Sequence, residues 1–427
     1  MSATERLYLN DSHRTEFEAR VVAAFERDGK TYVELDRTAF YPTGGGQPHD
    51  TGTLSGAEGE WHVDEVTAGE GAAEGQVQET GERVLHRVSR DLSQVGEAAR
   101  LPQPGDLLAG KVDLVRRRDH LQQHTGQHIL SQAFVQAAGI ETKSFHLGAL
   151  TSTIDVDPRV TDEIAAKAVA IANDVVFGDV PLRVHEVGPD ELARFNVRRQ
   201  TFHGERIRLV EIEGFDVSTC GGTHAHRSGE VGLIAVLSVE KAKGLHRVEF
   251  VCGGRALRAL QSDHAVVQQA ARALSTGADA VVTQVQKLVE QNLALRKRTQ
   301  TLFAASAGAQ AAELLEKAKP RGTARVVSAV LHDLSLEDAQ LLAKKIVDRP
   351  APIVALLGLA DAAAPKLLFA RSNDPALASL AMGPLIKSIA ERFGGRGGGS
   401  PGSAQASIAR ASELEAALGA ACESLPE

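Results

Sequence analysis

The pentapeptide His124-Thr-Gly-Gln-His128 (HTGQH) lies inside a stretch of helical composition, Asp119–Ala138, which contains no proline and ends at Gly139. An α-helix places residues four apart on one face, so the two imidazoles can share one metal ion. A glycine directly after the last helical residue is a typical helix end. The stretch therefore predicts a helix that presents a pair of metal ligands.

A second motif, Cys220-Gly-Gly-Thr-His224, lies further along the chain. Its two glycines allow a sharp turn, so that a thiolate and an imidazole can converge. Together the motifs supply three imidazoles and one thiolate, from His124, His128, Cys220 and His224, a donor set that suits zinc. We expect one Zn²⁺ per chain. Four protein ligands are typical of structural zinc and three of catalytic zinc, and the sequence leaves this choice open.

Other histidines surround the two motifs, namely His120, His146, His203 and His226. We interpret them as surface or supporting residues rather than as ligands. The helical motif has no glutamate after its first histidine, which disfavours a zinc protease of the HExxH type.

Composition excludes several classes of protein. With 427 residues, of which 43% are hydrophobic and 24% charged, the chain is long enough for several globular domains. It contains no long apolar run that would cross a membrane, and its N-terminus does not resemble a secretory signal. Three cysteines form no disulfide framework and fit a reducing cytoplasm. A net charge of −8 argues against a general polyanion binder, although local cationic patches can still contact RNA.

The pattern of the chain predicts a multidomain α+β protein. Residues 1–100 predict a small β-barrel: Arg20–Arg27 and Lys30–Asp36 are β-branched runs joined by Asp28-Gly29, a typical hairpin turn. Residues 101–254 mix further strands with the helices Asp119–Ala138 and Thr161–Val176, and we expect Ser144–Asp155 to be one strand. This part carries the predicted zinc ligands.

The last part of the chain separates into two regions. Residues 255–320 contain a single proline at their end and predict long helices, broken near residues 275–277. Apolar residues from Val281 to Leu302 recur at coiled-coil spacing, which indicates either a helical hairpin or a dimer interface. Residues 321–427 alternate strands and helices and predict an α/β domain with a flexible loop over 394–401.

Four motifs in this order resemble the editing region of alanyl-tRNA synthetases. They are Thr38–Pro48 (TAFYPTGGGQP), the two histidine motifs with Val210–Asp216 leading into the second, Lys243–Phe250, and the glycine-rich Gly394–Ala406. The resemblance covers nearly the whole chain, but the aminoacylation domain has no counterpart in it. The chain thus resembles a free-standing alanyl-tRNA editing protein of the AlaX type.

This resemblance implies a function and roles for residues. The protein would deacylate mischarged tRNA(Ala), removing serine and, as an open question, glycine, without aminoacylation activity or ATP. His124, His128, Cys220 and His224 would bind the zinc. Thr38 and Gln47 would be catalytic, with Thr38 selecting serine over alanine. The acceptor end of the tRNA would contact Gly45, Gly46, Thr125 and Arg206.

Cationic residues supply a further expectation about RNA. Two groups stand out in this acidic chain: Arg116–Arg118, and the set Arg194, Arg198, Arg199, Arg206 and Arg208. We interpret them as a groove for the acceptor stem. Arg396 is a further candidate for RNA contact, although the family often has a basic residue where this chain has Ser400.

Three other interpretations stay open. The chain would be a zinc-stabilised RNA-binding module without catalysis, an editing enzyme for seryl-tRNA(Thr), or a subunit that acts only beside a synthetase. A homodimer through the C-terminal or helical region, cytoplasmic localisation and no membrane partner complete the expectations.

Overall fold

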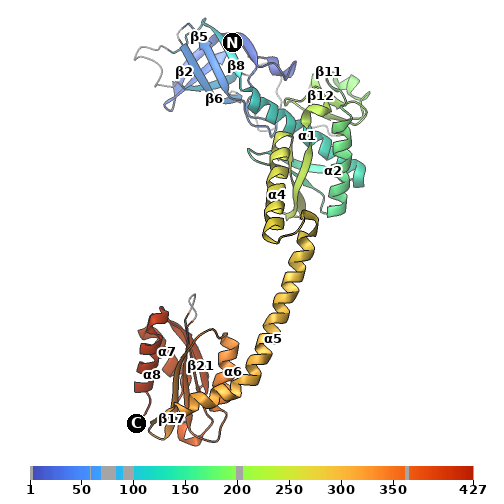
Figure 1. Ribbon diagram of the computed structural model, residues 1–427. Coiled ribbons are helices and arrows are strands. Elements are labelled where there is room, and N and C mark those ends of the chain that lie inside the picture. Colours follow the sequence, from blue (N-terminus) through green and yellow to red (C-terminus); the bar gives the residue numbers. More distant parts are fainter. Residues whose placement is uncertain are drawn as a thin grey trace. The chain divides into compact units, whose positions relative to one another are not determined.

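The computed structural model describes residues 3–57, 59–68, 83–89, 101–198, 205–360 and 365–426. The chain forms two compact units, Met1–Gln269 and Ala270–Glu427 (Figure 1). The molecule is a multidomain α+β protein, as the sequence predicts.

The first unit begins with the predicted β-barrel, which is closed in the order β2-β3-β7-β6-β5-β8 (blue in Figure 1). Its strands are β2 (Glu16–Arg27), β3 (Lys30–Leu35), β5 (Gly52–Gly56), β6 (Gly59–Ala68), β7 (Val84–Ser89) and β8 (Leu107–Val112). The turn between β2 and β3 is at the predicted position, with positive φ at Asp28 (52°) and Gly29 (69°). Positive φ at both residues matches the twist of the two strands, which explains why Asp-Gly forms this hairpin.

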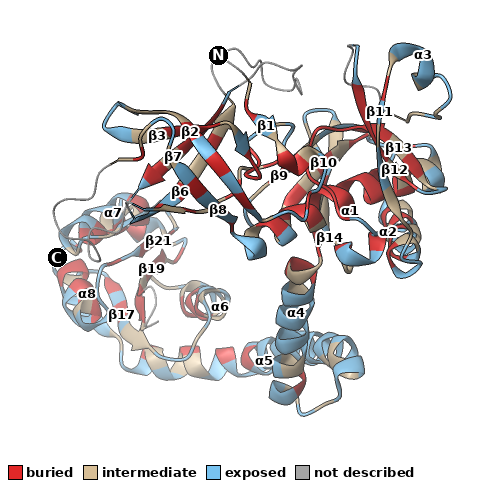
Figure 2. Ribbon diagram, turned by 90° about the horizontal axis from the view of Figure 1, so that it is seen from above, coloured by how far each residue is buried: buried red, intermediate tan, exposed pale blue. Residues whose placement is uncertain are grey.

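Helix α1 (Leu114–Ala138) follows the barrel directly. The carboxylate of Asp113 caps its first amides, and Gly139 ends it in the left-handed conformation, as predicted. Figure 2 shows that much of α1 is buried, because it lies against other elements of the unit on several sides. A helix buried in this way can hold polar side chains in an interior site.

Two antiparallel sheets complete the first unit. They have the orders β14-β15-β10-β9 and β11-β12-β13. A short parallel pair, β1 (Glu5–Arg6) with β4 (Arg37–Thr38), is formed by the N-terminal part of the chain that also carries the barrel strands. The strands are β9 (Thr142–Leu147), β10 (Ser152–Val156), β11 (Leu182–Val187), β12 (Ile207–Ile212), β13 (Asp216–Thr219), β14 (Ile234–Ala242) and β15 (Leu245–Cys252). The helices are α2 (Asp162–Phe177), α3 (Pro189–Leu192) and α4 (Gly254–Ala273). The prediction of one strand over Ser144–Asp155 is wrong, because the chain turns between β9 and β10 and pairs them as a hairpin.

A buried ion pair joins the barrel to α1. Arg117 and Asp50 are both fully buried, and their side chains approach to 2.5 Å. The same guanidinium donates to the carbonyl oxygens of Ser12 and Ala39, and the Asp50 carboxylate also accepts from the Tyr41 amide. Arg117 therefore satisfies backbone groups from two loops while its charge is neutralised, as a buried charge requires.

The second unit is a six-stranded sheet with helices on both faces. Its order is β16-β17-β18-β19-β21-β20, with β17 and β18 parallel. The strands are β16 (Lys319–Arg321), β17 (Ala324–Leu331), β18 (Ile353–Leu359), β19 (Lys366–Arg371), β20 (Arg396–Gly399) and β21 (Ser403–Ser407). One apolar core joins α6 (Leu336–Val347) and the end of α5 (Val281–Glu316) to the sheet. The other joins α7 (Met382–Arg392) and α8 (Leu414–Glu423) to it. This is the α/β domain that the sequence predicts.

Helix α5 continues without a break for 36 residues. Its last third is anchored by Phe303, Ala307, Ala311 and Leu315 in the core of the second unit. The apolar side chains earlier in α5 are exposed, including Val285, Leu288 and Leu295. The coiled coil predicted from their spacing stays a prediction.

The prediction of a flexible loop over 394–401 is wrong for its central part. Arg396–Gly399 forms β20, which pairs with β21 as a hairpin at the edge of the sheet. A Cβ on Gly397 or Gly399 would lie within 2.5 Å of atoms of β21, so the glycines let the strands approach closely. The glycine-rich composition serves this contact rather than flexibility.

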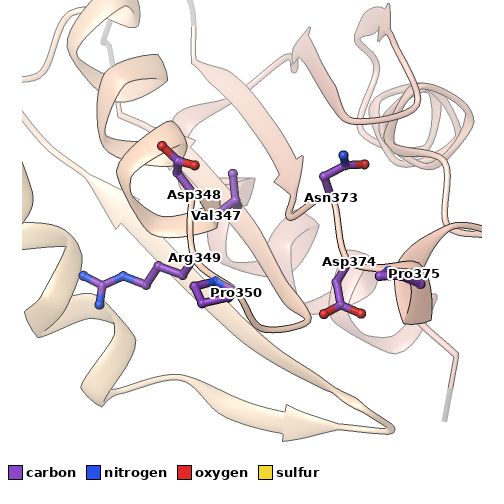
Figure 3. A pocket seen from close by; sticks show the side chains of 7 residues that line it. All are labelled: Val347, Asp348, Arg349, Pro350, Asn373, Asp374 and Pro375. Carbon is purple, nitrogen blue, oxygen red and sulfur yellow. The ribbon is translucent and has the colours of Figure 1, made fainter.

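A recess of about 430 Å³ lies in the second unit between two loops, 347–350 and 373–375 (Figure 3). Its lining mixes Asp348, Arg349 and Asp374 with two prolines and contains no histidine or cysteine. In the described part of the chain, no helix is both long enough and apolar enough to cross a bilayer.

The Arg117–Asp50 pair generates a stability prediction. Replacing Arg117→Met keeps most of the volume but leaves the Asp50 charge buried without its partner. We expect the barrel to lose about 3–5 kcal/mol of unfolding free energy. The measurement is urea unfolding followed by the fluorescence of Trp61, the only tryptophan of the chain, which is buried in the barrel.

The matched control is Arg118→Met, because Arg118 is the exposed neighbour on the same helix. Surface substitutions of this kind change stability by about 0.5 kcal/mol or less. An equal loss of unfolding free energy in the two variants would show that the Arg117–Asp50 pair does not stabilise the packing of the barrel against α1.

Candidate metal centre

The four predicted ligands come together in the first unit. His124 and His128 lie on α1, and Cys220 and His224 lie on the loop after β13. All four are buried, and their donor atoms lie within 4.8 Å of one another. The Nε2 atoms of His124 and His224 lie 3.4 Å and 3.2 Å from Cys220 Sγ. Residues almost a hundred positions apart thus form one cluster that is compact enough for a single ion.

The Cys220 loop can pack against α1 because residue 222 is glycine. A Cβ there would lie 2.2 Å from His124 Cε1 and 2.9 Å from Gln47 Oε1. No side chain other than hydrogen fits in this space. The loop also turns back on itself, since the amide of Gly222 donates to Cys220 Sγ over 3.4 Å. The glycine is therefore required by contact with the histidine.

Each imidazole has a polar neighbour at its second nitrogen. His124 Nδ1 lies 2.7 Å from Gln47 Oε1, and His224 Nδ1 lies 3.3 Å from Thr125 Oγ1. The Nδ1 of His128 has the Asp216 carboxylate at 3.7 Å. Partners at Nδ1 fix the ring orientation and direct Nε2 toward the centre, which is how metal-binding histidines are commonly held.

The electrostatics of the cluster favour a thiolate. Burial by itself would raise the pKa of the Cys220 thiol, but His124 and His224 and hydrogen bonds from the imidazoles hold it well below its usual value. Burial opposes protonation of His128 too, yet the nearby Asp216 carboxylate and Cys220 thiolate raise its pKa to about 9. Burial lowers the pKa of His224 to about 3. A buried thiolate requires a positive charge close to it, which a bound metal ion would supply.

A glycine turn brings the barrel into this site. Gly45 and Gly46 form the tip of a turn closed by two hydrogen bonds between Gly44 and Gln47, and both tip residues have positive φ. A Cβ on Gly46 would lie 2.7 Å from the Phe145 ring of β9. The turn places Gln47 so that its Oε1 contacts His124 and the Thr223 amide, while its Nε2 donates to Thr223 Oγ1.

The other predicted site residues lie in different surroundings. Thr38 is fully buried in the barrel, where its hydroxyl meets His86 Nε2 at 2.8 Å and accepts from the Phe40 amide. Thr125 holds both His224 and the Ala225 amide. Arg206 is exposed and pairs with Glu186. The structure thus brings Gln47 and Thr125 to the four ligands, whereas Thr38 contacts His86 and Phe40, and Arg206 contacts Glu186.

Three residues were missed as parts of the site. Asp216 lies beside His128, and Arg198 binds the Asp216 carboxylate through two nitrogens at 2.7 and 3.0 Å. Arg208 is buried and donates to the carbonyl oxygens of Cys220 and Gly222. The signal for Asp216 was present in the sequence, because it ends the motif that leads into Cys220.

The predicted cationic groove needs correction. Arg117, Arg198 and Arg208 are not surface cations, because each uses its guanidinium on internal partners. Arg118, Arg194 and Arg206 are exposed. Arg199 and His203 lie outside the described residues.

Comparison with known proteins adds independent evidence. A family model described as the threonyl and alanyl tRNA synthetase second additional domain matches residues 207–249, which include Cys220 and His224. The alanyl-tRNA editing protein AlaX-L of Pyrococcus horikoshii is 28% identical over 399 residues, 92% of each chain. The alanine–tRNA ligase of Natronomonas pharaonis is 32% identical over 437 residues, 99% of this chain and 44% of the ligase.

The alanine–tRNA ligase of Pyrococcus furiosus is 29% identical over 80% of this chain and 36% of its own length. The chain therefore spans less than half the length of these ligases but matches AlaX-L almost from end to end. The resemblance that the four motifs predict is confirmed: the chain is similar to the editing protein AlaX-L almost from end to end and to part of the alanine–tRNA ligases.

Proposed function

We propose that this protein is an aminoacyl-tRNA deacylase that removes serine from mischarged tRNA(Ala). The substrate is the ester between the amino acid and the terminal ribose. Water adds to the ester carbonyl carbon, the ribose hydroxyl leaves, and the products are free serine and tRNA with a restored hydroxyl. No ATP is consumed, because ester hydrolysis is favourable by itself.

The observation that carries this proposal is the buried set of three imidazoles and one thiolate in a chain homologous to AlaX-L. The name of that relative states alanyl-tRNA editing, and the two proteins match over 92% of their lengths. The buried cluster supplies a site whose chemistry fits hydrolysis.

We infer that His124, His128, Cys220 and His224 bind one Zn²⁺. The donor set fits, since zinc prefers imidazole nitrogen and thiolate sulfur. The charge fits as well, because a buried thiolate needs a cation close to it. When bound, the ion would supply Lewis acidity toward an ester oxygen or fix a polar group of the substrate.

The chain's own residues would orient the metal ligands and hold the tRNA substrate. Gln47 and Thr125 orient His124 and His224, as their contacts with Nδ1 indicate. The exposed tip at Gly45 and Gly46 has no side chains, so we propose that the acceptor end of the tRNA approaches the backbone there. We propose that the exposed Arg206 and Arg118 contact phosphates.

Discrimination for serine would use its hydroxyl. A site that hydrogen-bonds this group is left unsatisfied with alanine, which gives stronger selection than an apolar pocket. We keep Thr38 as the proposed selector. Its hydroxyl pairs with His86, whose pKa burial lowers to about 4, so the Thr38 hydroxyl faces a neutral imidazole. To contact the serine hydroxyl, the Thr38 hydroxyl would have to give up its hydrogen bond with His86.

A second candidate is editing of seryl-tRNA(Thr). It is favoured by the matching family model alone, whose description covers threonyl and alanyl synthetases. The relatives that match most of the chain are alanyl proteins, which makes tRNA(Ala) the better candidate. Glycyl-tRNA(Ala) is an additional substrate to be compared.

We also propose that the protein forms a homodimer through its helical or C-terminal region. The support is the exposed apolar series on α5, which would be covered by a second copy.

The first prediction here concerns activity. Purified full-length protein is expected to release serine from seryl-tRNA(Ala) and to leave alanyl-tRNA(Ala) and seryl-tRNA(Thr) acylated. Cys220→Ala should reduce release to the uncatalysed rate and remove zinc, as measured by elemental mass spectrometry. Cys422→Ser is the control, since Cys422 lies in the second unit. A folded, zinc-containing protein without any ester hydrolysis would exclude the enzyme and leave the RNA-binding interpretation.

The second prediction concerns the packing of the Cys220 loop. Gly222→Ala places a methyl group where His124 and Gln47 lie, so the loop must move away from α1. We expect loss of bound zinc and of hydrolysis. Gly308→Ala is the control, because a Cβ on that glycine of α5 meets nothing within 4 Å. Retention of zinc by the Gly222 variant would show that the loop tolerates displacement.

The third prediction concerns Gln47. Gln47→Leu removes the acceptor from His124 Nδ1 while filling a similar volume. Loss of such an outer partner typically weakens metal binding about 10–100-fold. Competition with a chelator measures the zinc affinity, and single-turnover deacylation measures the rate on the fully loaded variant. If the loaded variant hydrolyses at the normal rate, Gln47 positions His124 and has no direct catalytic role.

A further inference from the structure

A second group of metal-ligating side chains lies on the surface of the first unit. Asp11, His13 and His226 each offer a donor atom, and these atoms all lie within 4.8 Å of one another. Glu230 joins them, since its Oε2 lies 2.6 Å from His13 Nε2. We call these four residues the His13 cluster. All four are exposed, and the buried ligands at His124, His128, Cys220 and His224 are a separate set.

The cluster joins three separate segments of the chain. Asp11 and His13 lie on the turn after Leu9, His226 lies two residues after His224, and Glu230 lies on the short helical turn Ser228–Val231. The pairings cross between segments: His226 Nε2 lies 3.5 Å from Asp11 Oδ1, and His13 pairs with Glu230. The two imidazole rings lie together with centroids 3.8 Å apart. The donors of Asp11, His13 and His226 therefore lie close together on the surface, and Glu230 is hydrogen-bonded to one of them.

The backbone of each segment is fixed by contacts of its own. Arg117 donates to the Ser12 carbonyl, and the Ser12 hydroxyl accepts from the His224 amide. The His226 carbonyl accepts from the Leu182 amide, and the Glu230 carbonyl accepts from Gln122 Nε2. Only the exposed side-chain ends remain to adjust. The donors are thus brought together by the fold and can close on an ion through small rotations.

We propose that the His13 cluster binds a second divalent transition-metal ion, of which Zn²⁺ is the probe to use. Two imidazoles with two carboxylates suit zinc and its neighbours in the first transition series, whereas Mg²⁺ prefers oxygen ligands alone. The set contains no sulfur, so it differs chemically from the buried cluster. Two surface ion pairs would explain the His13–Glu230 and His226–Asp11 contacts singly, but they do not require the donor atoms of Asp11, His13 and His226 to lie within 4.8 Å of one another.

Binding there would have a structural consequence. The ion would link the turn at residues 11–13 to the loop that continues from Cys220 and His224. Since a ligand that binds only the folded state adds to its stability, occupation of the His13 cluster should raise the thermal stability of the first unit. This readout is independent of any hydrolytic activity.

The experiment is equilibrium dialysis of the full chain against Zn²⁺, with bound metal counted by elemental mass spectrometry. Wild-type protein should hold two zinc ions per chain, and His13→Asn with His226→Asn should hold one. Glu230→Gln, which replaces one carboxylate oxygen with an amide nitrogen and removes the charge, should weaken Zn²⁺ binding at the second site. A second equivalent of Zn²⁺ should raise Tm in the wild type and leave Tm of the double variant unchanged.

Two further measurements distinguish this site from the buried one. Titration with Co²⁺ should give a thiolate charge-transfer band with the buried ion only, because the His13 cluster has no sulfur. The matched control is His62→Asn with His332→Asn, which removes two exposed histidines outside both clusters and should leave two ions bound. One zinc per wild-type chain, or two in the His13/His226 variant, would overturn the proposal.

Discussion

The structure depends on holding the charge of Cys220 in the interior. A buried thiolate is costly unless positive charge and hydrogen-bond donors surround it. Here the imidazoles of His124 and His224 and the amide of Gly222 contact the sulfur, and Asp216 lies beside the third imidazole, His128. Burial raises the pKa of Cys252, the other deeply buried thiol, well above its usual value, because the loss of hydration outweighs the charge of the nearby Arg255. The surroundings thus shift the pKa of the same residue type in opposite directions at the two positions.

This constraint explains why the surrounding elements are built as they are. The Cys220 loop lies so close to α1 that residue 222 has room for a hydrogen atom but not for a Cβ, and only glycine meets this condition. Arg208 binds the carbonyl groups of the same loop, and the glycine turn at Gly45 and Gly46 brings Gln47 to His124. The barrel is in turn fixed to α1 by Arg117 and Asp50. Each contact serves to orient a donor, so the site depends on both the barrel and the sheets.

Local signals made much of this predictable from the sequence. The i, i+4 spacing on a proline-free helix predicts the pair on α1, and Asp28-Gly29 predicts the first hairpin, because both patterns act over a few residues. The role of Arg208 was not predictable in this way. A cation next to other arginines is typical of a solvated or RNA-binding face, and only the fold shows that its donors meet the Cys220 loop. The hairpin at Arg396–Gly399 was missed for a related reason, since glycine-rich composition is equally typical of loops.

The two histidine clusters differ in how strongly the protein pre-organises them. In the buried cluster, fixed neighbours hold the second nitrogen of each imidazole, and water competes little for the donors. In the His13 cluster the side chains face solvent and pair with carboxylates that water also hydrates. An ion in the first is expected to be retained as part of the fold, whereas one in the second exchanges with the medium. Because residues 224 and 226 are two positions apart on one loop, exchange at the surface would act on the segment that holds the buried ligand.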